Sequence, residues 1–485
     1  MCARWPSAAF LLIATTSAPL AAPASLDGAH AIERGYVDYF GKAAIDKGVV
    51  SVAPDGDDYL VSWDLQKALD LVGSPAGALR IGRFSYRLIP AGEGAWTATA
   101  DRFPSLAFDV PTDKGKMTGT LDFAGFRLDA GGDAAQANFL RSLVAADSLA
   151  GKFHLAEPDR NADFDLAESG LSIETRAKTS DGGAGVDVAI AQSVKSLNET
   201  ILAPPPSGEG APVAATYRIG AIAGGAAISG LRAREIGELW KDVVAHGEGA
   251  DAAVELNRRL RAALPLWNDL KTNGELHDLA LQTPMAEATV KTFAEKVGLS
   301  GLAADGAAQI GVTIDELRFK SPLLPPWADQ LSPISFRFDL SLAVNGLDQA
   351  AELALDDPGL DGKGELSPQT RDKIAAILVA GRPKLTLSPG RLTTPTLDLT
   401  FEGEASIETG APSGHFTFAA DGLDKTIALF EEVAKSEPDF QAAALSLIFA
   451  KGLATTGADG RLAWKVDVNE SGEVSVNGAP LPTEK

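Results

Sequence analysis

The sequence predicts an α+β fold built from long, mostly antiparallel, curved β-sheets, with amphipathic helices packed on one face. First, residues 334–344 read ISFRFDLSLAV, with apolar side chains at every second position, which is typical of a strand with one buried face. Second, several segments toward the C-terminus repeat apolar residues at helical spacing. Third, a chain of 485 residues with 45% hydrophobic content can bury large cores.

The first residues carry the features of a secretory signal peptide. Arg4 supplies a positive charge, residues 8–14 (AAFLLIA) form a short apolar run, and Ala22-Pro-Ala24 offers a small-residue cleavage site. We prefer cleavage at the end of this site, because proline fits poorly directly after a cut. The apolar run is too short for a membrane anchor. Removal of residues 1–24 is therefore predicted to release a soluble periplasmic protein without a transmembrane segment.

The composition excludes several classes of protein. With 65 acidic and 43 basic residues, the formal net charge is −22, which repels nucleic acid, so no nucleic-acid partner is expected. The single cysteine, Cys2, precedes the apolar run of the predicted signal peptide, on the wrong side for a lipid-attachment cysteine. The mature chain is therefore predicted to have neither disulfides nor thiol chemistry.

Residues 25–202 are predicted to form an N-terminal β-rich α+β region. It opens with a helix over 29–47, and a second helix is predicted over 133–149. Within the longest predicted strand the apolar alternation changes phase at Gly125, as a β-bulge would produce. The predicted strands are 59–65, 79–89, 96–100, 106–110, 117–128, 162–166, 171–175 and 186–190.

Residues 203–212 (APPPSGEGAP) contain four prolines and two glycines, which neither a helix nor a central strand tolerates. The segment is either a linker between two domains or a loop within one, and the pattern leaves both open. Residues 213–485 are predicted to form a C-terminal α+β region. It is expected to hold strands at 310–319, 334–344, 385–387, 397–407 and 416–418, a helix from 367 to 380, and an ambiguous segment, 285–297.

The order helix, helix, turn, strand occurs twice in the C-terminal region. In the first copy, two helices within 236–264 precede a turn at Asn273-Gly274, and in the second, two helices within 427–453 precede a turn at Asp459-Gly460. Corresponding residues of the two copies are separated in the sequence by a nearly constant number of positions. The separation is 186 for the turns (459 − 273) and 190 for Trp240 and Phe430 (430 − 240). This regularity indicates an internal duplication, with chance similarity of amphipathic helices as the alternative.

No motif for catalysis or cofactor binding stands out. The chain lacks a nucleophile elbow, a Walker phosphate loop and a Rossmann glycine motif, and its five histidines are too far apart for a helical metal pair. Residues 182–187 (GGAGVD) start like a calcium-binding nonapeptide, but a solitary copy favours a hairpin turn. Asp357, Asp361 and Gly362 resemble part of an EF-hand loop, but a proline replaces its bidentate glutamate. No metal, cofactor or catalytic residue is therefore predicted.

Two possibilities stay open. A pair of carboxylates could hydrolyse glycans without any local signature, because the two acids need only approach each other in space. Arg258, Arg259 and Arg261 could contact an anionic headgroup, or they could form a solvated stripe on a helix.

Parts of the sequence resemble uncharacterised proteobacterial periplasmic proteins that carry domains of unknown function and, more loosely, the YdgA-like and AsmA-like groups. These parts are 59–64 (YLVSWD), 117–123 (MTGTLDF) and 472–481 (GEVSVNGAPL). The resemblance covers most of the mature chain and carries no catalytic signature. The chain departs from the AsmA-like pattern because it has no predicted membrane-spanning N-terminal helix. The resemblance implies an elongated β-rich body with helices against curved sheets and an apolar groove for lipid chains.

The expected function is that of a secreted, non-enzymatic protein of the cell envelope. A groove between sheet and helices would bind a lipid or another apolar small molecule, and an envelope protein is the other expected partner. Trp240, Trp267 and Phe430, in or near the repeated helices, are candidates for the groove wall, although aromatic residues at helical spacing usually belong to a core. The alternatives are a scaffolding envelope protein without a ligand and a carboxylate-dependent glycan hydrolase.

Overall fold

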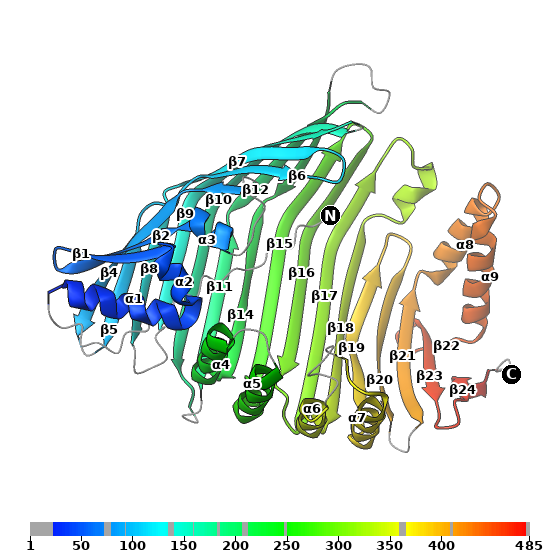
Figure 1. The fold of residues 1–485 in the computed structure, drawn as a ribbon. Helices are drawn as coiled ribbons and strands as arrows, with labels where there is room; N and C mark the ends of the chain where they lie inside the picture. Colours follow the sequence, from blue (N-terminus) through cyan, green and yellow to red (C-terminus); the bar gives the residue numbers. More distant parts are fainter. Residues whose placement is uncertain are drawn as a thin grey trace.

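The computed structural model describes residues 23–71, 79–92, 94–133, 140–158, 160–181, 185–205, 212–246, 250–357, 365–407 and 411–481. Within these residues the chain forms one large antiparallel sheet of 25 strands, so the predicted α+β class with long antiparallel strands is confirmed. The sheet is strongly curved (Figure 1). Its strands are β1 (Val50–Asp55), β2 (Asp58–Asp64), β3 (Leu79–Ile81), β4 (Arg83–Gly92), β5 (Ala95–Ala100), β6 (Leu106–Pro111), β7 (Lys116–Ala124), β8 (Arg127–Asp133), β9 (Arg141–Glu157), β10 (Arg160–Thr179), β11 (Val186–Val194), β12 (Ser196–Ala203), β13 (Val213–Ile219), β14 (Ala221–Leu231), β15 (Asp269–Thr283), β16 (Ala286–Ser300), β17 (Asp305–Lys320), β18 (Ile334–Asn345), β19 (Lys384–Thr393), β20 (Asp398–Ile407), β21 (Pro412–Asp421), β22 (Thr455–Thr456), β23 (Leu462–Val468), β24 (Val474–Val476) and β25 (Ala479–Pro480).

Helices accompany the sheet mainly at its edges. In the described residues they are α1 (Leu26–Phe40), α2 (Lys42–Asp46), α3 (Leu65–Leu71), α4 (Ala233–His246), α5 (Ala250–Ala263), α6 (Leu347–Leu355), α7 (Pro368–Ala380), α8 (Leu423–Val433), α9 (Asp439–Gly452) and the short 3-10 helix η2 (Pro326–Gln330). The pair α4–α5 joins β14 to β15, and the pair α6–α7 joins β18 to β19, so both pairs lie at the lower edge in Figure 1. The pair α8–α9 follows β21 and lies at the upper edge, because an odd number of antiparallel strands separates it from α6–α7.

Local sequence signals set several helix ends. Ser367 precedes α7 and its hydroxyl accepts a hydrogen bond from the amide of Thr370, with Pro368 in the first turn, as the sequence predicts. The single helix predicted over 29–47 is divided into α1 and α2. The division falls at Gly41, whose positive φ of 79° is a backbone conformation that glycine adopts readily and that cannot continue a helix.

In the N-terminal half of the sheet, the lower and the upper ends of the long strands β9 and β10 pair with different strands. We call these two parts of the sheet the lower level and the upper level. At the lower level the order is β1, β2, β4, β5, β8, β9, β10, β11, β14, β15, and it continues through β16, β17, β18, β19, β20, β21, β23, β24 and β25. At the upper level β3 pairs with β6, β6 with β7, and β7 with the far half of β9. On the other side of β10, β12 and β13 lie between β10 and β15. The long strands β9 and β10 therefore span both levels.

The main hydrophobic core lies at the N-terminal end. Helix α1 lies across β1. Most buried residues of this core come from α1 and from strands β1, β2, β4, β5 and β8. Inside it the hydroxyl groups of Tyr36 and Tyr86 lie 2.5 Å apart, and the Trp63 ring meets Tyr36 edge to face at 5.3 Å. Leu88 and Val61 are fully buried there.

A crease crosses the sheet from β7 and β8 to β17. Four residues along it have a left-handed backbone: Gly125 (φ 60°), Gly170 (φ 62°), Asp278 (φ 52°) and Glu316 (φ 52°). Such a residue interrupts the alternation of side chains along a strand. Two consecutive residues that face the core side are therefore three positions apart across the crease, whereas elsewhere in the strand they are two positions apart. The phase change predicted at Gly125 is thereby confirmed, because the rings of Phe123 and Phe126 both contact Phe103.

The pairing register between neighbouring strands is the same on both sides of the crease. Each strand changes the phase of its side-chain alternation at the same place, and we call this change a step. In β15 and β16, for example, His277 pairs with Thr292 and Leu279 pairs with Val290. The crease ends at β18, where the register shifts between Ile314 and Leu317 of β17. There the hydroxyl of Ser335 accepts a hydrogen bond from the amide of Glu316 at 3.1 Å, so the amide at the shift is satisfied.

Two local predictions are wrong or refined. Residues 141–149, predicted as helix, lie in β9, because pairing with β8 and β10 overrides their alanine content, and 134–139 lie outside the described residues. The ambiguous segment 285–297 is mostly strand, in β16.

Asn273-Gly274 lies inside β15 and does not form a turn, whereas Asp459-Gly460 does lie between β22 and β23. The two helix pairs of the predicted duplication also lie at opposite edges of the sheet. The duplication is therefore not shown. Strands β12 and β13, which flank the proline-rich segment, pair within one sheet, and the division into two domains stays a prediction.

Candidate functional site

One face of the sheet carries rows of apolar side chains that continue the N-terminal core. Residues paired across antiparallel strands point to the same face, so a face can be followed from strand to strand. Starting at the buried Leu88, the pairings run through Ala98, Ala130, Ser142 and Thr175 to Ile190 of β11. The core side of the N-terminal end is therefore the same side of the sheet as the rows described next.

Three rows extend from Ile190, Val188 and Val194 toward the C-terminus, and Thr272 is the one polar side chain in these three. A mixed row lies between the first and the third, with the polar residues Gln192 and Glu295 beside Gly224, Gly274, Val312 and Phe338. We call the surface of these rows the apolar face. The three apolar rows are Ile190, Ala226, Thr272, Val297, Ile310, Leu340; Val188, Ile228, Leu270, Leu299, Ala308, Leu342, Leu385, Ala405; and Val194, Ile222, Leu276, Phe293, Ile314, Phe336, Leu392, Leu399.

The opposite face of the same strands is polar and ion-paired. Lys296 reaches across Gly311, where a side chain would collide with it, to form an ion pair with Asp339. Gln309 also donates a hydrogen bond to Asp339 at 3.0 Å. Burial alone would raise the pKa of Asp339, but the hydrogen bonds from Lys296 and Gln309 lower it below its ordinary value.

The strand ISFRFDLSLAV, now β18, shows how the two faces differ. Its predicted alternation is confirmed: Phe336 and Phe338 stack at 6.2 Å on the apolar face, and Arg337 is exposed on the other. Asp339, on the same polar face as Arg337, does not meet solvent freely, since it is buried under its ion pair with Lys296.

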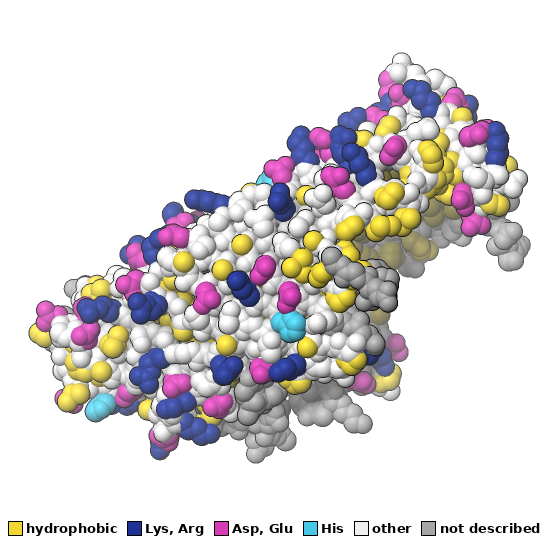
Figure 2. Space-filling view, turned by 90° about the horizontal axis from the view of Figure 1, so that it is seen from above, with side chains coloured by type: hydrophobic (Ala, Val, Ile, Leu, Met, Phe, Trp, Pro, Cys, Tyr) yellow, Lys and Arg dark blue, Asp and Glu magenta, His cyan; other side chains and the backbone are white. Residues whose placement is uncertain are grey.

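Helices leave most of the length of this strand uncovered. Among the described residues, α6 and α7 contact only its lower end, because they connect β18 to β19 at the edge. Leu342 remains 39% exposed, and Ile310 on the neighbouring strand remains 47% exposed. In Figure 2 hydrophobic side chains gather on the hollowed side of the C-terminal half, and charged side chains line the opposite convex side.

Glu168 is a carboxylate on the apolar side of β10. It pairs in register with Leu149 on one neighbouring strand and with Leu197 on the other. Burial raises the pKa of Glu168, because the charged form loses solvation among these apolar neighbours.

The three aromatic residues predicted for a groove wall do not come together. Trp240 lies exposed on α4 and donates a hydrogen bond from Nε1 to the carbonyl oxygen of Tyr39 at 2.8 Å, which ties α4 to α1. Trp267 lies between α5 and β15, near the same lower edge, whereas Phe430 lies on α8 at the upper edge. A shared wall of these three residues therefore has no support, and the rows of the apolar face, recognisable only from strand pairing, replace it as the candidate.

The acidic motifs have structural explanations. Asp187 accepts hydrogen bonds from Ser180 and from the amide of Gly230, and these lower its pKa. Strands β10 and β11 pair as a hairpin would, but residues 182–184 of the predicted turn lie outside the described residues. Asp357 accepts hydrogen bonds from the amide and hydroxyl of Ser367 at the start of α7. Asp361 and Gly362 lie outside the described residues. No group of three or more metal-ligating side chains occurs in the part of the chain that the structure describes.

The basic run forms contacts between helices. Arg259 is paired with Asp242 of α4 at 2.7 Å, and Arg261 is paired with Asp356 beyond α6 at 2.5 Å. These ion pairs join neighbouring helices along the lower edge, so Arg259 and Arg261 have structural partners.

The predicted signal peptide lies outside the described residues, apart from Pro23 and Ala24. In the described part of the chain, no helix is both long and apolar enough to cross a membrane. The periplasmic location and the resemblance to envelope proteins stay predictions. No family model matches this chain, and no curated protein matches it.

Proposed function

We propose that this protein is a non-enzymatic periplasmic protein of the cell envelope that binds the acyl chains of lipids on its apolar face. The observation that carries the proposal is the continuation of the apolar rows beyond the covered core, with Ile310, Leu299 and Leu342 still exposed. Soluble proteins rarely expose a contiguous apolar surface of this extent unless it binds something.

The dimensions of the face suit an elongated apolar ligand. From β11 to β20 the rows cross seven strand spacings, or about 34 Å at about 4.8 Å for each spacing. One leaflet of a bilayer has a hydrocarbon layer of about 15 Å, so the face is long enough for an extended acyl chain. Aliphatic side chains without hydrogen-bonding groups match the acyl chain, and each methylene that leaves water contributes about 0.8 kcal/mol.

The test compares two neighbouring residues of β18 that point to opposite faces. Leu342→Glu puts a charge on the apolar face, and Ala343→Glu puts the same charge on the exposed polar face. Binding of a fluorescent fatty acid, cis-parinaric acid, is measured by titration, and lipids that co-purify with the protein are identified by native mass spectrometry.

We expect Leu342→Glu to weaken fatty-acid binding by about tenfold or more, because a buried unpaired charge opposes an apolar ligand. Ala343→Glu should bind as the unmodified protein does. Equal binding by both variants, or absence of binding to the unmodified protein, would overturn the proposal and favour a scaffolding protein without a ligand.

A further inference from the structure

The upper edge of the sheet carries protruding apolar side chains on three of its connections. Met285 lies in the turn between β15 and β16, Leu323 and Leu324 lie in the connection from β17 to β18, and α9 follows β21. Leu323 is 75% exposed, and Leu445 and Phe449 of α9 are 59% and 64% exposed. We call Met285, Leu323, Leu324, Leu445, Ile448 and Phe449 the upper rim.

Helix α9 has an unusual composition for a helix in contact with water. No charged residue occurs from Phe440 to Ala450, yet only Ala444 of the helix is buried. A helix that is apolar on all sides is normally surrounded by protein or lipid. Since Leu445, Ile448 and Phe449 are spaced as i, i+3 and i+4, they form one exposed apolar face.

Side-chain contacts hold parts of the rim together. The hydroxyl of Ser321 donates to the carbonyl oxygen of Met285 at 2.6 Å, which joins the first two connections. The rings of Trp327, in η2, and Phe440, in α9, lie 5.1 Å apart edge to face, and Phe440 also contacts Phe430 at 5.4 Å. The second connection is therefore fixed against α8 and α9.

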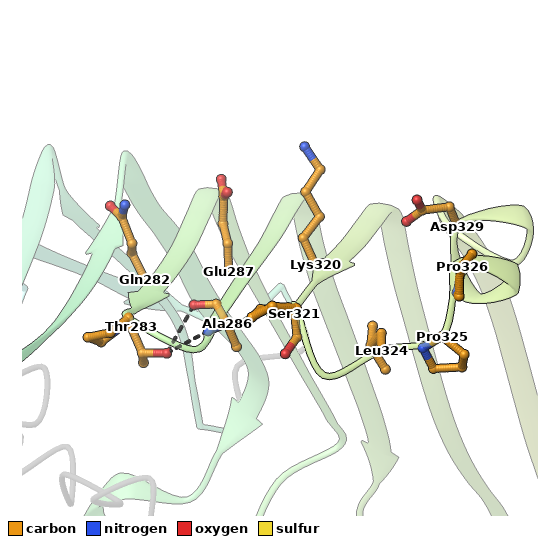
Figure 3. A pocket seen from close by; sticks show the side chains of 12 residues that line it. Gln282, Thr283, Ala286, Glu287, Lys320, Ser321, Leu324, Pro325, Pro326 and Asp329 are labelled. Carbon is orange, nitrogen blue, oxygen red and sulfur yellow. Dashed lines mark hydrogen bonds between the residues drawn. The ribbon is translucent and has the colours of Figure 1, made fainter.

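An open pocket of about 420 Å³ lies at this edge (Figure 3). Its lining residues show which side of the sheet edge is polar and which is apolar. Gln282, Glu287 and Lys320 pair in register and point to one side, whereas Leu324 points to the other. The polar residues belong to the charged face of the sheet. Leu281 and Phe319, one position before Gln282 and Lys320, lie on the apolar side and lead directly to the rim.

We propose that the upper rim inserts into the surface of a lipid bilayer and brings the end of the apolar face to the membrane. The route by which acyl chains would reach that face rests on the proposed function, whereas insertion of the rim does not. A bilayer is the occupant that the observations favour, because an apolar helix and separate loop tips can enter a fluid apolar layer together. The net charge of −22 opposes anionic surfaces, so binding should be strongest on uncharged lipid and should not require anionic lipid.

The test measures sedimentation of the full chain with vesicles of pure phosphatidylcholine and with vesicles that also contain phosphatidylglycerol. The rim variants are Leu445→Ser/Phe449→Ser and Leu323→Ser. The matched control is Val379→Ser, which removes an exposed apolar side chain from α7 at the opposite edge. Circular dichroism and thermal unfolding check that each variant is folded.

We expect the double rim variant to lower binding to phosphatidylcholine by about tenfold or more and Leu323→Ser to lower it several-fold, with Val379→Ser unchanged. Absence of vesicle binding by the unmodified protein would overturn the inference. So would binding that occurs only with phosphatidylglycerol, or a dimer in solution that the rim variants dissociate.

Fatty-acid binding in vesicle-free solution separates the two proposals. If the rim variants lose vesicle binding but keep cis-parinaric acid binding, both proposals are supported. If the unmodified protein binds vesicles but no free fatty acid, the rim inference is supported and the proposed function is overturned.

Discussion

Leu88 and Ile310 lie on the same side of one sheet, joined by an unbroken series of paired residues, yet Leu88 is fully buried and Ile310 is 47% exposed. The strands around the two residues are alike in having an apolar side. What differs is the helix above them: α1 lies across the N-terminal strands, whereas the later helix pairs connect strands at the edges. Exposure of the C-terminal apolar rows therefore reflects the position of the helices, not a change in strand pattern.

The largest expected effect contrasts the two residues directly. Leu88→Ala should lower the free energy of unfolding by about 3 kcal/mol, because it leaves a cavity in a fully packed core. Ile310→Ala should cost about 1 kcal/mol or less, because that side chain is already half in water. Urea unfolding followed by circular dichroism measures both. Equal losses would mean that the C-terminal rows are covered as completely as the core.

A second prediction sharpens the description of the covered side. Tyr36→Phe should lower the free energy of unfolding by about 1–3 kcal/mol, because it leaves the buried hydroxyl of Tyr86 without its partner. The double variant Tyr36→Phe/Tyr86→Phe should cost less than the sum of the single variants, since it removes both hydroxyls. Strict additivity in a double-mutant cycle would show that the two groups do not interact.

The same pair predicts a response to alkaline pH. Burial raises the pKa of Tyr86 to about 12, and burial raises that of Tyr36 as well. Because the folded state holds these protons more tightly than the unfolded state, their contribution to stability is full below pH 10 and is lost as the pH rises toward 12. Ultraviolet titration should show both tyrosines still protonated at pH 10.5 in the folded protein. Their ionisation near pH 10 would contradict the burial of the pair.

The smallest expected effect concerns Glu168, at the boundary between the two regions. Because its pKa is raised in the folded protein, the fold is favoured at acidic pH and loses this contribution as the pH rises through the folded-state pKa. Glu168→Gln should therefore raise the melting temperature at pH 8 slightly and leave it nearly unchanged at pH 4. Glu402→Gln, an exposed acid on the polar side of β20, is the control and should change neither value. A lower melting temperature for Glu168→Gln at pH 8 would show that its charge has a stabilising partner.

The sequence predicts well what depends on short patterns. Alternation identifies β18, the phase change identifies the crease at Gly125, and a hydroxyl followed by proline identifies the start of α7. These signals are local, because each follows from the geometry of a few consecutive residues. Residues 141–149 fail for the opposite reason, since their strand conformation depends on pairing with distant β8 and β10.

The candidate site depends on information that a single strand does not carry. The pattern of β18 shows that Leu342 and Leu340 share a face, but only the registers with β17 and β19 show that the face continues over the sheet. Whether a helix covers that face depends on the edge at which each connection leaves. Trp240, by contrast, ties α4 to α1, and the apolar rows are defined by pairing between strands that are distant in the sequence.

The crease has a consequence for how this chain can change during evolution. Each strand that crosses it contributes one extra step, and the steps match, so a one-residue deletion at Gly170 would turn every later side chain of β10 to the wrong face unless its neighbours changed too. Insertions and deletions should therefore accumulate in the connections and be almost absent within the strands. Strands β7 to β17 should therefore change length only together, whereas at β18 a register shift already absorbs the mismatch.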